Sequence, residues 1–135
     1  MKNIHHVVMF QPRFARKVEA GTKLQTIRLP RKVPVKPGDW LSLREWTGKP
    51  YRSKQRIIRE VTCKKTSILH LDWSDVMILD GQPLNSNLQQ WFAQNDGFKS
   101  ADEMRQWFAA THTLPFDGVV FFWQNNSPQP STKPC

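Results

Sequence analysis

The residues of this chain that could do chemistry together lie between Gly21 and Arg28, in the order Gly-x-Lys-x-x-Thr-x-Arg. Side chains alternate between two faces of an extended segment, so Thr26 and Arg28 are expected to point the same way. A turn at Gly21 would bring Lys23 to the same side. Burial and the like charge of Arg28 would lower the pKa of Lys23, which makes its amine a base beside a hydroxyl nucleophile.

The same three side chains have a simpler interpretation as an anion site. Lys23 and Arg28 would hold phosphate groups, and Thr26 would be an ordinary strand residue. On these residues alone we favour the anion site, because nothing in the segment itself supplies the third group of a catalytic set.

A carboxylate beside Lys23 would favour catalysis. The candidates are Glu45, Glu60 and Asp96. Glu45 and Glu60 lie in strand-like segments rich in arginine, where surface ion pairs are expected. Asp96 precedes Gly97 after an aromatic-rich helical segment. It is either a turn residue at a helix end or an acid that faces the cationic cleft.

Charge is distributed unevenly along the 135 residues. Residues 1–65 carry 17 Lys and Arg against 4 acids, a net of +13, whereas residues 66–135 carry 3 against 7, a net of −4. This asymmetry indicates a face for a polyanion, built by the first half of the chain. Within it, Arg31 and Lys32 follow the motif as further candidates for ligand contact.

Trp46 and Tyr51 flank a basic connection that contains Lys49, Arg52 and Lys54. Exposed aromatic rings among cations are an arrangement that stacks nucleic-acid bases. The alternative is that these rings belong to the core, as the spacing of most tryptophans in this chain suggests.

Hydrophobic periodicity predicts short elements throughout. The expected helices are 11–20, 86–95 with Ser86 as the cap, and 100–110 with a Ser100–Glu103 capping box. The expected extended segments are 4–10, 23–29, 39–46, 55–63, 66–72, 75–80, 82–84 and 117–123. Five to seven short strands with three short helices favour an α+β fold, a small mixed β-barrel with peripheral helices, over a doubly wound sheet.

Composition bounds the remaining possibilities. We expect one domain over residues 1–123 and a disordered tail over 124–135, which is rich in Pro, Ser, Asn and Gln. No apolar run has the length of a membrane helix or signal peptide, and Cys63 and Cys135 are expected to be free thiols in a reducing cytoplasm. The spacing of Cys and His fits no metal site, and no nucleotide-cofactor motif occurs, so we expect no metal, no cofactor and a monomer.

Four segments together resemble the ASCH domain family, in a form common among phage and prophage proteins. The first is the motif from Gly21 to Arg28. The others are Lys36-Pro37-Gly38-Asp39, then Asp96-Gly97-Phe98 with the helix after Ser100, and finally Leu114-Pro115-Phe116-Asp117-Gly118 with the strand after it. The resemblance as a whole covers roughly residues 4–123, and the segments support it by their order along the chain.

The resemblance implies a PUA-like barrel with a cleft lined by the motif, and a role in RNA binding. One branch of the family removes the acetyl group from acetylcytidine with a Lys, a Thr and a Glu. Lys23 and Thr26 match the first two, and Asp96 stands where the glutamate is expected. RNA cleavage has also been proposed within the family.

We therefore expect a domain that binds RNA or a nucleoside-like ligand in a basic cleft. The alternative is a hydrolase of an acylated nucleoside amide, with Lys23 as base, Thr26 as nucleophile and Asp96 in support. An RNA-cleaving enzyme is a further alternative, and a protein-interaction module with a basic face is the third class.

Overall fold

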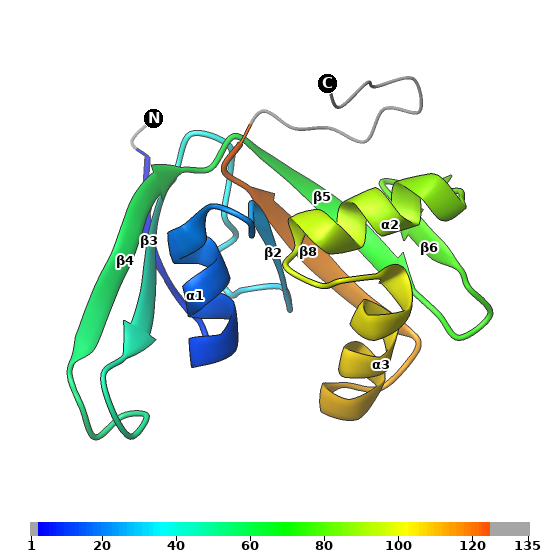
Figure 1. Ribbon diagram of the computed structural model, residues 1–135. Helices are drawn as coiled ribbons and strands as arrows, with labels where there is room; N and C mark the ends of the chain where they lie inside the picture. Colours follow the sequence, from blue (N-terminus) through cyan, green and yellow to red (C-terminus); the bar gives the residue numbers. More distant parts are fainter. Residues whose placement is uncertain (1–2, 125–135) are drawn as a thin grey trace.

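A computed structural model describes residues 3–124, and in this range the chain forms three helices and eight strands in two sheets (Figure 1). The tail expected over residues 124–135 lies outside the described range except for Gln124, and so does Cys135. In chain order the elements are β1 (His5–Met9), α1 (Pro12–Ala20), β2 (Gln25–Arg28), β3 (Trp40–Trp46), β4 (Gln55–Thr62), β5 (Lys65–Leu71), β6 (Met77–Leu79), β7 (Gln82–Pro83), α2 (Ser86–Asn95), α3 (Ala101–Thr111) and β8 (Phe116–Phe122).

The two sheets differ in strand direction. The three-stranded sheet has the order β1-β3-β4, with β1 parallel to β3 and β3 antiparallel to β4. The five-stranded sheet has the order β2-β8-β5-β6-β7 and is antiparallel throughout. β1 and β2 are therefore edge strands of different sheets, and α1 connects them along the chain.

α1 follows from its local sequence. Pro12 suits the first turn of a helix because its missing N–H has no partner there. The apolar side chains of Phe14 and Val18 are four residues apart and are both buried. Gly21 ends the helix in the left-handed conformation at φ 82°, which a residue without a Cβ adopts readily.

α2 and α3 lie along one side of the five-stranded sheet (Figure 1). Side chains from both helices join the main core, among them Phe92, Met104 and Phe108. The side chain of Asn85 accepts a hydrogen bond from Leu88 N, so Asn85 is the N-cap of α2 and the prediction of Ser86 was one residue late. Ser100 caps α3 as predicted, by accepting from Glu103 N at 3.1 Å.

The mixed α+β class and the three helices are confirmed for the described residues. The strands number eight rather than five to seven, because the two-residue β7 and the short β2 both pair. Asp80 and Gly81 both take positive φ in the turn between β6 and β7, which confirms the predicted turn. No helix within residues 3–124 has the length and apolar character needed to cross a membrane.

Candidate functional site

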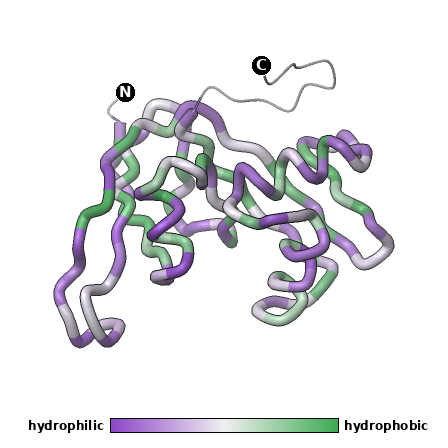
Figure 2. Tube along the Cα trace, in the orientation of Figure 1, coloured by the Kyte–Doolittle hydropathy of each residue, from purple (hydrophilic) through white to green (hydrophobic). Residues whose placement is uncertain are grey.

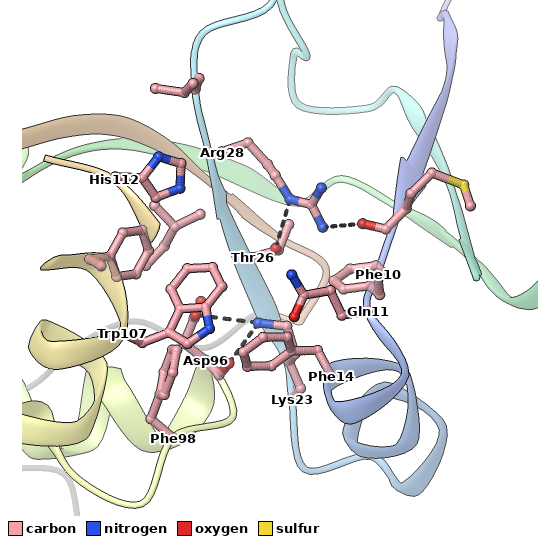
Figure 3. A pocket seen from close by; sticks show the side chains of 14 residues that line it. Phe10, Gln11, Phe14, Lys23, Thr26, Arg28, Asp96, Phe98, Trp107 and His112 are labelled. Carbon is pink, nitrogen blue, oxygen red and sulfur yellow. Dashed lines mark hydrogen bonds and ion pairs between the residues drawn. The ribbon is translucent and has the colours of Figure 1, made fainter. Parts of the chain in front are cut away.

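A pocket of about 290 Å³ opens between the edge of β2, the start of α1 and the C-terminal half of α3 (Figure 3). Polar side chains of Lys23, Thr26, Arg28 and Asp96 form one part of its lining, and aromatic rings form another. A cavity of this size, largely apolar with a few converging polar groups, is typical of small-molecule sites.

The turn after α1 explains how Lys23 enters this pocket. Gly21 N donates to Val18 O, and both Thr22 N and Lys23 N donate to Lys17 O, which folds the chain back over the helix end. Leu24 N then donates to the carbonyl of Asn95 at 2.7 Å, which attaches the segment to the end of α2. The tight turn that begins at Gly21 thus places Lys23, two residues later, next to Asp96.

Lys23 and Asp96 form a buried ion pair. The Lys23 Nζ lies 3.3 Å from Asp96 Oδ2 and donates to the backbone carbonyl of the same residue at 2.6 Å. Asp96 Oδ1 accepts from the amide of Gln25 at 3.3 Å. Asp96 is also the C-cap of α2, where the helix dipole disfavours a negative charge, so Lys23 compensates a carboxylate in an unfavourable position.

Burial moves both groups of this pair toward their neutral forms. The pKa of Lys23 falls to about 8, first because of burial and further because of the positive charges of Arg28 and Lys17, while Asp96 opposes the fall. Burial likewise raises the pKa of Asp96, against the attraction of Lys23. At neutral pH Lys23 keeps its charge, and just above pH 8 it becomes a neutral amine.

Arg28 connects the two sheets at the pocket. Its Nη2 donates to the carbonyl of Met9 on β1 at 2.7 Å, and its Nε donates to Thr26 Oγ1 at 3.1 Å. The guanidinium also lies over the ring of Phe10, 4.8 Å from its centroid. Burial and the charge of Arg31 lower the pKa of Arg28 to about 10, so it remains a cation at neutral pH. Its other N–H groups are donors for an anionic or carbonyl ligand.

Thr26 is buried and its hydroxyl oxygen accepts from Arg28, as the alternation along the strand predicts. Among the described residues no hydrogen bond joins Thr26 to Lys23. The Thr26 hydroxyl therefore does not donate to the Lys23 amine in this structure. An alkoxide formed there would be stabilised by the guanidinium of Arg28.

Aromatic rings form a wall of the pocket beside Lys23, whose Nζ lies 5.2 Å from the centroid of the Phe14 ring. Phe14 and Phe98 meet edge to face with centroids 5.4 Å apart, and Trp107 meets Phe14 at the same distance. His112 lies at the end of α3 and stacks on Phe108 at 5.6 Å. The three phenylalanines are buried and Trp107 and His112 are half-buried, so these last two rings could offer a stacking surface to a planar ligand.

The structure brings together only part of the candidate residues. Lys23, Thr26, Arg28 and Asp96 line one pocket. Gly21 does not line the pocket; it ends α1 and begins the turn that leads to Lys23. Arg31 donates to Val7 O beside Arg28, outside the pocket lining, and Lys32 is exposed in the loop that follows.

Trp46 and Tyr51, the other candidates for ligand contact, lie outside this pocket. They contact each other at 5.1 Å at the end of the β3–β4 hairpin. Glu45 makes the expected ion pairs, with Arg16 and Arg56, although its side chain is buried. Within residues 3–124 Glu60 forms no ion pair and accepts from Ser42 Oγ instead. Hydrogen bonds from Arg56 and Arg16 lower the pKa of Glu45 although burial opposes them.

Sequence reasoning missed the aromatic wall and the polar residue behind it. Phe98, Trp107 and His112 have the spacing of core residues, and a pocket wall has no separate pattern. Gln25 was also missed, although its position next to Thr26 on a short strand places its side chain on the Asp96 side.

Comparisons of this chain with protein-family models, with curated proteins and with solved structures found no match. Within residues 3–124, no three His, Cys, Asp or Glu side chains are placed to hold a metal ion together. The site is therefore interpreted from its own residues.

Proposed function

We propose that this chain is an ASCH-type domain that binds RNA or a nucleoside-like ligand in the pocket of Lys23, Thr26, Arg28 and Asp96. The observation that carries the proposal is the buried Lys23–Asp96 pair beside an aromatic wall. A planar base would stack on the rings of that wall, and the paired charges would meet its polar edge. Arg28 adds donors for a carbonyl or phosphate oxygen.

The PUA-like barrel belongs to this proposal. Its support is the way in which two edge strands of different sheets approach each other. Arg28 on β2 donates to Met9 O on β1, and Arg31 donates to Val7 O on the same strand at 3.0 Å. Two guanidinium groups thus occupy the place where strand pairing would close the two sheets.

A second candidate function is hydrolysis of an acylated cytidine. The observation that favours it is Lys23, whose pKa of about 8 makes it a base in the range where enzymes use lysine. Neutral Lys23 would take the proton of Thr26, and the Thr26 oxygen would add to the amide carbonyl. The amine would leave with that proton from Lys23, and water would then release the acyl group from Thr26.

Incubation with acetylcytidine, and separately with RNA, distinguishes these functions. A binder holds the ligand without release of acetate, and a hydrolase releases it. Lys23→Met and Thr26→Val should each abolish turnover, because a base and a nucleophile act as a unit. In a binder, Thr26→Val retains most of the affinity, while Lys23→Met loses a charge-assisted contact. Binding of neither ligand by the folded protein would contradict the proposal.

A further inference from the structure

The three-stranded sheet has one face that is open to solvent. Along β3, the side chains of Leu41, Leu43 and Glu45 point toward α1, and those of Trp40, Arg44 and Trp46 point the other way. The neighbouring strands add residues by their register to this second face. We call His5, Val7, Trp40, Arg44, Trp46 and Ile57 the open sheet face.

Aromatic rings occupy both ends of the open sheet face. His5 and Trp40 stack at 5.9 Å with their planes 22° apart, and Trp40 remains 44% exposed. At the other end Tyr51 packs against Trp46 and is 88% exposed. Trp40 and Trp46 are separated by six residues of strand, about 20 Å. Rings spaced along an open sheet provide separate stacking positions for successive bases.

Cations surround the second pair of rings. Lys49, Arg52 and Lys54 lie in the turn of the β3–β4 hairpin, and within residues 3–124 none of them forms a salt bridge. The turn projects away from the other elements and is hydrophilic (Figures 1 and 2). Arg44 donates to Ser42 and Gln55 rather than to a carboxylate. Glu60 is an acid on this same side of the sheet, opposite Ser42 and between the positions of Trp40 and Arg44, and it accepts from Ser42 Oγ.

The turn of the hairpin is internally bonded, so it presents these groups in a defined arrangement. Thr47 N donates to Lys54 O at 2.9 Å, and Ser53 Oγ both accepts from Gly48 N and donates to Lys49 O. Tyr51 has φ 64°, in the left-handed region that disfavours residues with a Cβ. The positive φ belongs to the tight turn of the hairpin, and the turn holds the exposed Tyr51 ring against Trp46.

β1 connects the open sheet face with the pocket. Val7 belongs to the open sheet face, and Met9 and Phe10, two and three residues later, line the pocket. A ligand chain that leaves the pocket past Met9 would therefore reach the open sheet face first.

We propose that the open sheet face and the hairpin turn bind a single strand of RNA. Bases stack on Trp40 and on the Trp46–Tyr51 pair, while Lys49, Arg52 and Lys54 contact phosphates. This inference rests on the proposed function, because the nucleoside bound in the pocket would be one unit of the longer RNA strand. The ligand is then a polynucleotide rather than a free nucleoside.

The test measures binding of a fluorescent 12-nucleotide polyuridine RNA by anisotropy, with acetylcytidine binding measured in parallel. Tyr51→Asn removes the ring while asparagine tolerates the same backbone, so the fold is expected to persist. It should weaken binding of the 12-mer by about 5- to 100-fold, the range for loss of one base–aromatic stack. Arg52→Gln should reduce the slope of log affinity against log salt by about 0.7.

Arg59→Gln is the matched control. Arg59 lies on β4 opposite Leu43, on the side of the sheet that faces α1. The Arg59→Gln substitution removes the same single positive charge as Arg52→Gln. It should leave 12-mer affinity near the parent value. Equal binding by Tyr51→Asn and the parent, or an equal loss in Arg59→Gln and Arg52→Gln, would overturn the inference. Absence of acetylcytidine binding with a preserved Tyr51→Asn effect would instead contradict the nucleoside site in the pocket and leave the open sheet face as an RNA site.

Discussion

Lys23 and Asp96 lie 73 positions apart in the chain, yet the ammonium of one is 3.3 Å from the carboxylate of the other, and both side chains are less than 5% exposed. A buried pair of this kind contributes little to stability, because removing two charges from water costs about as much as their attraction returns. Apolar side chains would fill the same space at least as well. Stability alone therefore does not account for the pair, and its position at the pocket agrees with the ligand-binding role that we propose.

The depressed pKa of Lys23 predicts that stability rises with pH in the alkaline range. The ordinary pKa of 10.5 applies to the unfolded chain and about 8 to the folded protein. Between these values the unfolded chain binds more protons, so the free energy of unfolding increases with pH, by about 3 kcal/mol in total. Urea unfolding from pH 7 to 10 should show this rise relative to a Lys23→Met, Asp96→Asn double variant. Parallel curves for the two proteins would contradict the assignment.

Asp96→Asn separates the electrostatic role of Asp96 from its role in the helix end. Asp96 has right-handed backbone angles, φ −85° and ψ −1°, which asparagine adopts without strain. Loss of the carboxylate should lower the pKa of Lys23 further, because Asp96 is the group that raises it. We expect a loss of about 3 kcal/mol at a pH where Lys23 is protonated in both proteins. The loss should shrink as the pH rises from the lowered Lys23 pKa of the variant to about 8, the pKa in the parent, and stay constant above that. If Asp96 orients Lys23, turnover falls by orders of magnitude while anion affinity holds or rises. Unchanged stability and ligand binding would mean that Asp96 only ends the helix.

Gly97 packs against the side chains of two lysines. A Cβ at this position would lie 3.3 Å from Lys17 Cδ and 3.4 Å from Lys23 Cδ, and φ is 98°. Gly97→Ala should therefore destabilise the protein by about 1–2 kcal/mol, because of the left-handed backbone and the close contact with Lys17. Gly81→Ala is the control and should cost less, since its φ is 80° and nothing lies within 4 Å of the added Cβ. Thermal melting of both variants tests this, and an equal loss of stability in the two would contradict it.

The lowered pKa of Asp39 predicts that the protein loses stability in acid, for a reason that does not involve the pocket. The backbone N–H of Ile4 donates to this carboxylate, and this bond, together with those from His6 and Lys36, lowers its pKa from 3.8 to about 2. A depressed carboxylate pKa stabilises the fold above pH 3.8, and the contribution disappears as the pH falls through about 2. Asp39→Asn should lose this stabilisation, so its unfolding curve should vary less with pH below 4 than that of the parent. Identical acid transitions in the two proteins would exclude Asp39 as the cause.

The fold followed closely from periodicity and turn residues. The helix expected over residues 86–95 has those bounds, and the extended segment after Gly21 became β2 with Thr26 and Arg28 joined on one face. Such patterns are local, because each element buries one side of its own sequence. The placement of Asp96 beside Lys23 came from the order of motifs along the chain, not from any local pattern.

The aromatic residues could not be assigned from the sequence. Trp107 lines the pocket, Trp123 is buried in the core and Trp40 is exposed on the open sheet face, although all three occur in similar apolar contexts. Their surroundings depend on which elements pack together over long sequence distances. For the same reason the sequence does not place Trp46 and Tyr51 relative to the pocket, since nothing local shows that β3 and β4 carry their turn away from it.

The central claim is that a nucleoside-like ligand occupies the pocket on Lys23, Arg28 and the aromatic wall. A ¹⁵N–¹H correlation spectrum of the protein, titrated with acetylcytidine, tests it most directly. We predict that the Trp107 indole, the Arg28 Nε–H and the Thr26 amide shift together with one affinity, and that Gly81 in the β6–β7 turn does not shift. Signals from these three groups that stay in place at saturating ligand would contradict the account.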